Sequence, residues 1–256
     1  FKPFSFDSTL IICAKIMTNF YFDHFFYKSL ENTNDTAKKI YDSKKSKNIA
    51  LLALLQKRGR GRVDRKWISN KGDLTCSFLV SFQTTVNKLG QINLWFINKV
   101  LIILKKLNPD LNLKIKWPND IYLDEKKLGG ILVETSILRG NVNYFLFGVG
   151  INLVSNPKNL SYPTTSLANL SKKISSLKLF LEISKSITNN YFELKNSSLL
   201  RIDNDFLKNF KDFKRIIKIK FKEKVLEGKF NSITKNGELV LITSQRKLLI
   251  SFGEIL

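Results

Sequence analysis

The hydrophobic pattern divides the chain into a long part in which helices and strands alternate and a shorter part rich in strands. Apolar residues at helical spacing alternate with short continuous apolar runs through most of the sequence. After residue 214 the pattern changes to short strands with a hairpin signal at Asn236-Gly237. We therefore predict an α+β domain over residues 21–213, a small all-β domain over residues 214–256, and a possible extension over residues 1–20.

Helices are predicted where apolar residues recur three and four positions apart. The first helix should begin at Asn34 or Asp35, because a short polar side chain there can cap the free backbone amides of the first turn. It is expected to end near Ser46. The other predicted helices cover residues 91–107, 177–192 and 202–213.

Strands are predicted where apolar residues form short runs or alternate with polar ones. In the first domain they cover residues 49–55, 74–82, 114–117, 121–123, 128–136 and 144–153. In the second domain they cover residues 217–221, 225–233, 238–243 and 247–252. The turns after residue 114 are short, so the strands that follow should form an antiparallel meander.

The last predicted strand of the first domain has two chemically different faces, because side chains alternate between the faces of a sheet. The face expected to lie on the core carries Phe147, Val149, Ile151 and Leu153. The opposite face carries Gly148, Gly150 and Asn152. Glycine weakens a strand, so this second face predicts that a flat ligand or another strand packs against the backbone. Gly129-Gly130 repeats the feature on the preceding strand.

The loop from Gly59 to Arg65, here called the Arg/Gly loop, is the most unusual segment because glycines alternate with arginines. A guanidinium group is always charged and presents a planar fork to carboxylate or phosphate, while glycine lets the backbone approach a ligand. The pattern indicates an anion site, although a flexible basic loop that contacts RNA or nothing has the same composition. Trp67 either stacks on a planar base or fills the core. Lys127, in a charged turn, is by itself typical of a solvated side chain.

The composition indicates a folded globular protein, with 256 residues, 43% hydrophobic and 25% charged residues, and no low-complexity tract. The formal charge of +22 admits a nucleic acid or an anionic membrane as a partner. The lysines are nevertheless spread along the whole chain among Asn, Ile and Phe, a pattern that a compositional bias of the genome also produces. The charge alone therefore establishes no partner.

Cysteine usage and hydropathy restrict the compartment. Cys13 and Cys76 are too few and too far apart for a zinc motif or a disulfide framework, so we expect buried thiols in a reducing cytoplasm. The apolar stretches at residues 10–14 and 94–104 are too short, or too interrupted by Asn and Lys, to span a bilayer. No membrane anchor is predicted.

Four motifs follow one another along the chain. They are the Arg/Gly loop followed by Lys66-Trp67, then Lys116-Trp117-Pro118-Asn119-Asp120, then Lys-Leu-Gly-Gly-Ile-Leu-Val-Glu from Lys127 to Glu134, then Gly-Val-Gly-Ile-Asn-Leu from Gly148 to Leu153. In this order and spacing, the sequence over residues 24–256 resembles the biotin protein ligase family. A chance match to the ordered set is far rarer than a match to any single motif.

The resemblance implies a fold and a reaction. The fold is a mixed sheet with flanking helices, related to the catalytic domain of class II aminoacyl-tRNA synthetases, followed by an SH3-like β-barrel over about residues 214–256. The reaction uses biotin, ATP and Mg²⁺ to form biotinyl-5′-AMP and then transfers biotin to a lysine of a biotin carboxyl carrier protein, a subunit of acetyl-CoA carboxylase. No specific DNA site is expected, since about thirty residues before Thr33 are too few for a helix-turn-helix domain. A monomer or homodimer without membrane contact is expected.

The resemblance also implies which residues bind the substrates. Lys127, Arg60 and Arg62 would be the catalytic cations. The biotin site would comprise Asn32, Thr33, Asn34, Gln56, Gly59, Arg60, Gly61, Arg62, Lys127, Gly130, Gly148 and Gly150. The ATP site would comprise Arg65, Trp67, Lys116, Asn119, Asp120 and Asn152. No separate set of metal ligands is predicted, although Asn119 and Asn152 would help to hold nucleotide or metal.

Two positions depart from the family pattern. Asn32 stands where the family has Ser, and Val63-Asp64 stands where an arginine or other residue and a Gly are usual. Asn can still donate a hydrogen bond, and Asp tolerates a left-handed backbone better than most residues. We expect these departures to change affinity more than activity.

Two other functions fit parts of the sequence. A lipoate ligase or related acyltransferase resembles this family in architecture but does not have the Gly-Arg-Gly-Arg loop. A basic nucleic-acid-binding module would use the positive charge but would leave the ordered motifs without a role.

Overall fold

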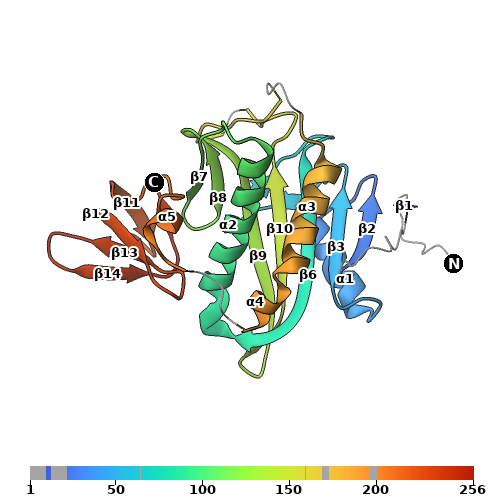
Figure 1. The fold of residues 1–256 in the computed structure, drawn as a ribbon, viewed down its shortest axis with the longest axis horizontal. Coiled ribbons are helices and arrows are strands. Elements are labelled where there is room, and N and C mark those ends of the chain that lie inside the picture. The colour runs from blue at the N-terminus through green and yellow to red at the C-terminus, as the bar shows by residue number, and fades with distance from the viewer. Residues whose placement is uncertain (1–9, 13–21, 64, 159, 169–172, 197–200) are drawn as a thin grey trace.

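A mixed eight-stranded sheet forms the centre of the computed structural model, which describes residues 10–12, 22–63, 65–158, 160–168, 173–196 and 201–256 (Figure 1). The strand order is β1-β2-β3-β6-β10-β9-β8-β7. The strands are β1 (Leu10–Ile12), β2 (Asp23–Tyr27), β3 (Ile49–Ala53), β6 (Leu74–Thr85), β7 (Leu113–Lys116), β8 (Asp120–Leu123), β9 (Lys126–Leu138) and β10 (Asn141–Ile151). Strands β2 and β3 run parallel and the other neighbours run antiparallel. The predicted α+β class with a mixed sheet is confirmed.

The predicted meander is also confirmed, because β7, β8, β9 and β10 are neighbours in the sheet and follow one another in the chain. The sequence pattern did not predict β1 and β2. Strand β1 lies within the possible extension over residues 1–20, and most of that extension, including Cys13, lies outside the described residues. Cys76 is fully buried, as predicted, and burial raises the pKa of its thiol.

Helices cover the two faces of the sheet unequally (Figure 1). On one face lie α2 (Leu89–Leu107), α3 (Ser176–Asn189) and α4 (Tyr191–Asn196). A short 3-10 turn at Val86–Lys88 leads into α2. The opposite face is covered in part by α1 (Thr33–Asp42), which packs on β3 and β6 through a small cluster that includes Ala37 and Leu51.

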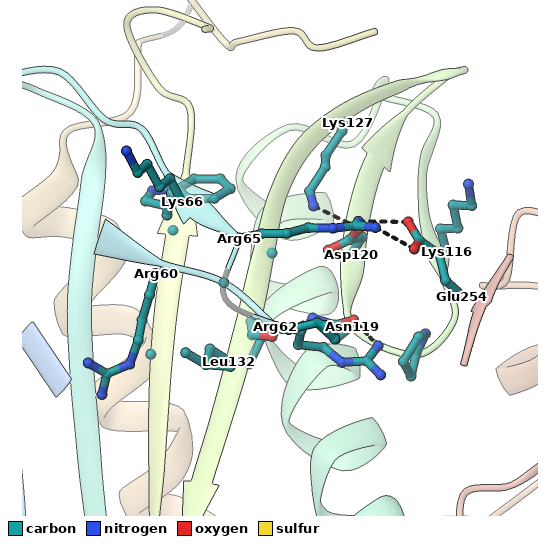
Figure 2. Close-up of a pocket in the computed structure, with 18 of the residues that line it drawn as sticks. Arg60, Arg62, Arg65, Lys66, Lys116, Asn119, Asp120, Lys127, Leu132 and Glu254 are labelled. Carbon is teal, nitrogen blue, oxygen red and sulfur yellow. Dashed lines mark hydrogen bonds and ion pairs between the residues drawn. The ribbon is translucent and has the colours of Figure 1, made fainter. Parts of the chain in front are cut away.

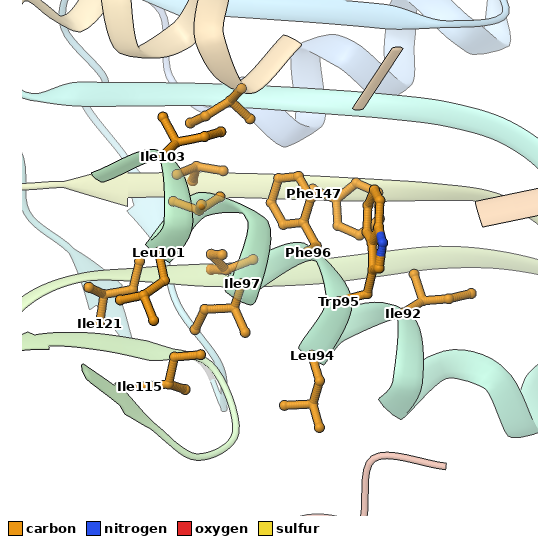
Figure 3. Packing of buried hydrophobic residues seen from close by; sticks show 14 of the residues in the cluster. Ile92, Leu94, Trp95, Phe96, Ile97, Leu101, Ile103, Ile115, Ile121 and Phe147 are labelled. Carbon is orange, nitrogen blue, oxygen red and sulfur yellow. The ribbon is translucent and has the colours of Figure 1, made fainter. Parts of the chain in front are cut away.

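The main core lies between the sheet and α2. Trp95, Phe96 and Leu101 of α2 are fully buried (Figure 3). The ring of Phe96 stacks on Phe147 of β10, with ring centres 4.1 Å apart. Burial of these side chains supplies most of the driving force for this layer, at roughly 25 cal/mol for each Å² of apolar surface removed from water. Phe147 therefore faces the core, as predicted.

The first helix starts and ends earlier than predicted. Asn32 is its N-cap, and its side-chain oxygen accepts hydrogen bonds from the backbone amides of Asn34 (2.9 Å) and Asp35 (3.2 Å). The predicted start at Asn34 or Asp35 was therefore two or three residues late. The helix ends at Asp42, because Lys44 adopts a left-handed backbone conformation (φ 58°) and the chain turns before Ser46.

Two later helix predictions were wrong in extent. Residues 177–192 form α3 and then α4, with a break at Asn190. Residues 202–213 contain only the single-turn α5 (Asn204–Leu207). The segment after α5 pairs with the backbone of Ile115, which donates to Asn209 O (2.7 Å) and accepts from Lys211 N (2.9 Å). Pairing with β7 replaces the helical hydrogen bonds there.

The C-terminal part is a five-stranded antiparallel sheet with the order β14-β13-β12-β11-β15. Its strands are β11 (Ile216–Phe221), β12 (Lys224–Ile233), β13 (Leu239–Ile242), β14 (Lys247–Ile250) and β15 (Glu254–Ile255). All but β15 were predicted. The SH3-like classification and the domain boundary at residue 214 stay predictions.

The C-terminal sheet is held against the start of α2 by a close contact between glycines. A Cβ atom on Gly90 would lie 2.3 Å from Asn236 O, and Gly237 has φ +86° and lies against Gly90. Trp117 Nε1 also donates to Gly237 O at 3.2 Å. Because no side chain fits between the two segments, the Asn236-Gly237 turn and α2 pack backbone to backbone. This contact places the C-terminal sheet beside the turn that follows β7.

Candidate active site

A cleft of about 480 Å³ opens on the sheet face opposite α2. Strands β9 and β10 form its floor. One wall is the Arg/Gly loop with its short hairpin of β4 (Gly59–Arg60) and β5 (Lys66–Trp67). The other wall is the turn after β7 together with β15 and the end of β11 (Figure 2).

All the predicted site residues line this cleft except Gly59 and Asn152. A Cβ atom on Gly59 would lie 2.5 Å from Trp67 O, so this glycine lets the β4–β5 hairpin close. Asn152 is 1% exposed and donates from Nδ2 to Thr165 O at 2.9 Å, while its Oδ1 has no hydrogen-bond partner. The structure therefore gives both residues supporting positions behind the cleft. Asp64, the second departure from the family pattern, lies outside the described residues.

The floor is flat because it carries glycines where side chains would stand. A Cβ atom on Gly150 would lie 2.3 Å from the ring of Trp67, so the indole lies directly on the backbone of β10. A Cβ atom on Gly148 would lie 2.6 Å from Asn34 Oδ1. The alternation predicted for this strand is confirmed, since Phe147 and Val149 belong to the opposite core.

One end of the cleft is uncharged and polar. Gln56 Oε1 accepts hydrogen bonds from the amide (2.7 Å) and the hydroxyl (3.0 Å) of Thr33. Ser77 Oγ donates to Asn34 Oδ1 at 2.6 Å. The Nδ2 group of Asn34 is buried without a hydrogen-bond partner. A buried donor without a partner is costly, so this end is suited to a ligand that supplies an acceptor.

The Arg/Gly loop folds back on itself over the cleft. Gly61 N donates to Arg65 O at 2.6 Å. The turn places Arg62 across the cleft, where its guanidinium group donates to Asn119 Oδ1 (3.0 Å) and to Gly253 O of the C-terminal part (3.4 Å). Burial lowers the pKa of Arg62. The loop therefore bridges the eight-stranded sheet and the C-terminal sheet.

The other two arginines of the loop pair with carboxylates. Arg60 points away from the cluster of Arg65, Asp120 and Lys127 (Figure 2) and makes a two-bond contact with Asp35 (2.8 and 2.7 Å). Arg65 makes a two-bond contact with Glu254 of β15 (2.7 and 2.5 Å). This contact raises the pKa of Arg65 and lowers that of the Glu254 carboxyl.

Two lysines differ in how they are held. Lys127 Nζ pairs with Asp120 Oδ2 at 2.8 Å. Lys116 Nζ lies 5.7 Å from the centre of the Tyr122 ring, and burial lowers the pKa of Lys116. Among the described residues no carboxylate lies within ion-pair distance of Lys116. Lys116 is therefore suited to an incoming anion.

Several cleft residues were not predicted. They are Leu132, Tyr122 and Tyr162 from the catalytic part and Lys220, Lys222, Phe252, Gly253 and Glu254 from the C-terminal part. Tyr162 and the C-terminal residues carry no local pattern that marks them, because they reach the cleft from a loop and from a separate sheet, whereas Tyr122 and Leu132 lie on β8 and β9 of the main sheet. Leu132 lies inside the third motif, and the motif alone did not assign it to the cleft.

Within the described residues, no group of three or more His, Cys, Asp or Glu side chains could hold a metal ion. No helix in that part of the chain is long and apolar enough to cross a membrane.

A model of the biotin/lipoate A/B protein ligase family matches residues 26–152. A biotin protein ligase from Aquifex aeolicus, solved in complex with biotin and ATP, superimposes with a TM-score of 0.75 at 26% identity, covering 91% of this chain and 97% of that one. This chain belongs to the biotin protein ligase family.

Two curated members of the biotin protein ligase family show how far the sequence match extends. The bifunctional ligase/repressor BirA of Escherichia coli is 36% identical over 107 residues, which are 41% of this chain and 32% of BirA. The human biotin–protein ligase is 31% identical over 127 residues, which are 46% of this chain and 17% of that protein. The chain thus spans a third or less of the length of these two relatives.

Proposed function

We propose that this member of the biotin protein ligase family activates biotin with ATP and attaches it to a lysine of an acceptor protein. One observation carries the proposal. A single cleft joins an uncharged polar end, where a buried amide donor of Asn34 has no partner, to a cluster of cations that includes Arg62 and Lys127. The related Aquifex aeolicus protein has been solved with both proposed substrates.

The polar end favours biotin over lipoate. The ureido ring of biotin offers a carbonyl acceptor and two N–H donors, whereas the dithiolane ring of lipoate offers neither. Asn34 Nδ2 would donate to the ureido oxygen, and Gly148 leaves room for the ring on the sheet. A site built around a buried polar group rejects an analogue that leaves the group unpaired. The lipoate alternative is therefore not favoured.

The cations suit the two reaction steps. In the first step an oxygen of the biotin carboxylate attacks the α-phosphorus of ATP, and the bond to pyrophosphate breaks. Lys127 and Arg62 would stabilise the negative charge on the carboxylate and phosphate oxygens. In the second step the acceptor amine attacks the acyl carbon, loses a proton, and AMP leaves. Trp67 would cover the adenine, and the ordered Arg/Gly loop would keep water from the anhydride.

The oxygens beside Lys127 fit Mg²⁺. Asp120 presents a carboxylate at the cleft, whereas the amide oxygen of the neighbouring Asn119 accepts a hydrogen bond from Arg62. Mg²⁺ is commonly held by one or two carboxylates together with substrate phosphates, so a larger ligand set is not required. A bound Mg²⁺ would neutralise charge on the phosphates, and Asp120 would hold it.

The partners follow from the same proposal. The acceptor would be a biotin carboxyl carrier protein, a subunit of acetyl-CoA carboxylase. A monomer or homodimer, a cytoplasmic location and the absence of a specific DNA site stay predictions from the sequence.

Pyrophosphate release tests the function. Purified protein with ATP and Mg²⁺ should release pyrophosphate with biotin, and not with lipoate or without an acid. Lys127→Ala should slow the release by about 100-fold or more, because it removes a preorganised cation from the reacting oxygens. Lys126→Ala, an exposed neighbour, is the matched control and should leave the rate unchanged. Release with lipoate alone, or an unimpaired Lys127→Ala variant, would contradict the proposal.

A further inference from the structure

The segment between β10 and α3 contributes an aromatic residue to the cleft. Tyr162 lines the cleft, and the centre of its ring lies 5.2 Å from Lys127 Nζ. The Lys127 side chain is 14% exposed, and Asp120 Oδ2 lies 2.8 Å from Nζ. The ammonium group is therefore held between a carboxylate and an aromatic ring.

Backbone hydrogen bonds fix Tyr162 relative to Lys127. Lys127 N donates to Pro163 O at 2.9 Å, and Thr165 N donates to Lys127 O at 2.9 Å. These two bonds form a short parallel bridge between Lys127 and Thr164. Tyr162 directly precedes this bridge, so the pairing holds its backbone beside Lys127, and the ring can leave the ammonium group only by rotation of the side chain.

The bridging segment is itself anchored to the eight-stranded sheet. Thr164 Oγ1 donates to Pro157 O at 2.6 Å, and Asn156 Nδ2 donates to Thr164 Oγ1 at 3.2 Å. Asn152 Nδ2, just after β10, donates to Thr165 O at 2.9 Å. The end of β10, the segment and Lys127 are therefore connected by one continuous set of hydrogen bonds.

An aromatic ring holds a cation differently from a carboxylate. Asp120 offsets the charge of Lys127 and competes with an incoming anion for the ammonium group. The face of an aromatic ring attracts a cation through its quadrupole but carries no net charge. A ring can therefore keep the ammonium group in place while its full charge stays available to a substrate carboxylate and phosphate.

We propose that Tyr162 is a positioning residue, which holds the Lys127 ammonium group in the cleft during formation of the adenylate. The catalytic consequence rests on the proposed function, whereas the placement of the ring rests on the contacts alone. The ring rather than the hydroxyl is the essential part.

Two substitutions of Tyr162 distinguish the role of the ring from that of the hydroxyl. Tyr162→Leu should lower kcat for biotin-dependent pyrophosphate release by about tenfold and change KM for ATP and biotin by less than about twofold. Tyr162→Phe keeps the ring and should stay within about twofold of the wild type. Leu160→Ala, an exposed position in the same segment, is the matched control and should have no effect. A Phe variant as impaired as the Leu variant, or a fully active Leu variant, would overturn the proposal.

A double-mutant cycle shows whether Tyr162 acts through Lys127. In a Lys127→Met background, Tyr162→Leu should cause no further loss of the residual rate. If the two losses multiply instead, Tyr162 does not act through Lys127 and the proposal is wrong.

A measurement without turnover separates this inference from the proposed function. Lysines are dimethylated with ¹³C, and the Lys127 signal is identified by its absence in Lys127→Arg. Its methyl resonances should show an upfield ring-current shift in the wild type and in Tyr162→Phe, and not in Tyr162→Leu. A missing shift in an active wild-type protein would overturn the inference. The shift in a wild-type protein that releases no pyrophosphate with biotin would support the placement and reject the proposed function.

Discussion

The two faces of β10 show how one strand builds both a core and a binding site. On the face toward α2, Phe147 is fully buried and stacks on Phe96. On the opposite face, Gly148 and Gly150 leave the backbone bare, and Asn34 and the ring of Trp67 occupy the space of the missing side chains. The first face supplies stability through apolar burial. The second gives up that burial, and the result is a flat floor for a ligand.

This difference predicts whether a mutation changes mainly stability or mainly catalysis. A substitution on the α2 face should change mainly the free energy of unfolding, because the side chain of Phe147 packed there does not line the cleft. A change on the glycine face should appear mainly in catalysis, because the groups above it touch the cleft.

The largest effect is expected on the core face. Phe147→Ala removes a fully buried ring and should lower the free energy of unfolding by about 3–5 kcal/mol. Denaturant unfolding measures this change, and pyrophosphate release per folded molecule should stay near the wild-type rate. A loss of under about 1 kcal/mol would show that the two faces do not differ as described.

The next effect is expected at Gly150. The Gly150→Val side chain would overlap the ring of Trp67, whose nearest atom lies 2.3 Å from the Cβ position, and would push the indole off the floor. We expect biotin-dependent pyrophosphate release to fall by roughly 10- to 100-fold, with a smaller change in unfolding free energy than for Phe147→Ala. Steady-state kinetics and denaturant unfolding of the same sample test this. Wild-type kinetics would mean that the indole is not required on the floor.

A smaller effect is expected at Ser77. Ser77→Ala removes the hydroxyl that donates to Asn34 Oδ1 at 2.6 Å and leaves that buried acceptor unpaired. The cost should be about 1 kcal/mol, seen as a roughly fivefold higher KM for biotin with little change in KM for ATP. Equal changes in both KM values would contradict the placement of biotin at the polar end.

The smallest effect is expected at His24, which lies away from the cleft and is the chain's one histidine. Its Nε2 lies 2.9 Å from Ser184 Oγ, and burial lowers its pKa from the usual 6.5. Because the unfolded state then takes up the proton first, stability is complete above pH 6.5 and falls as the pH drops below it. Unfolding at pH 7.5 and 5.5 should show this fall in the wild type and less of it in His24→Gln.

The sequence predicted the elements whose pattern is local. The period-two alternation around Gly148 and Gly150 identified both faces of β10, and the turns after residue 114 gave the meander. It failed where tertiary pairing replaced helical hydrogen bonds, as at residues 202–213, which pair with Ile115. It also missed β2, whose place in the sheet depends on pairing with β3 rather than on its own pattern.

The sequence by itself indicated which motifs line the cleft, because the Arg/Gly loop, Lys127 and the strand glycines follow one another in the order of the biotin protein ligase family. Only the tertiary structure decided how those groups are held. It placed Arg60 on Asp35, paired Arg65 with Glu254 from a separate sheet, and set Tyr162 against Lys127. The physical reason is that a motif fixes residue types along the chain, whereas charge pairing and ring contacts depend on distances between segments far apart in sequence.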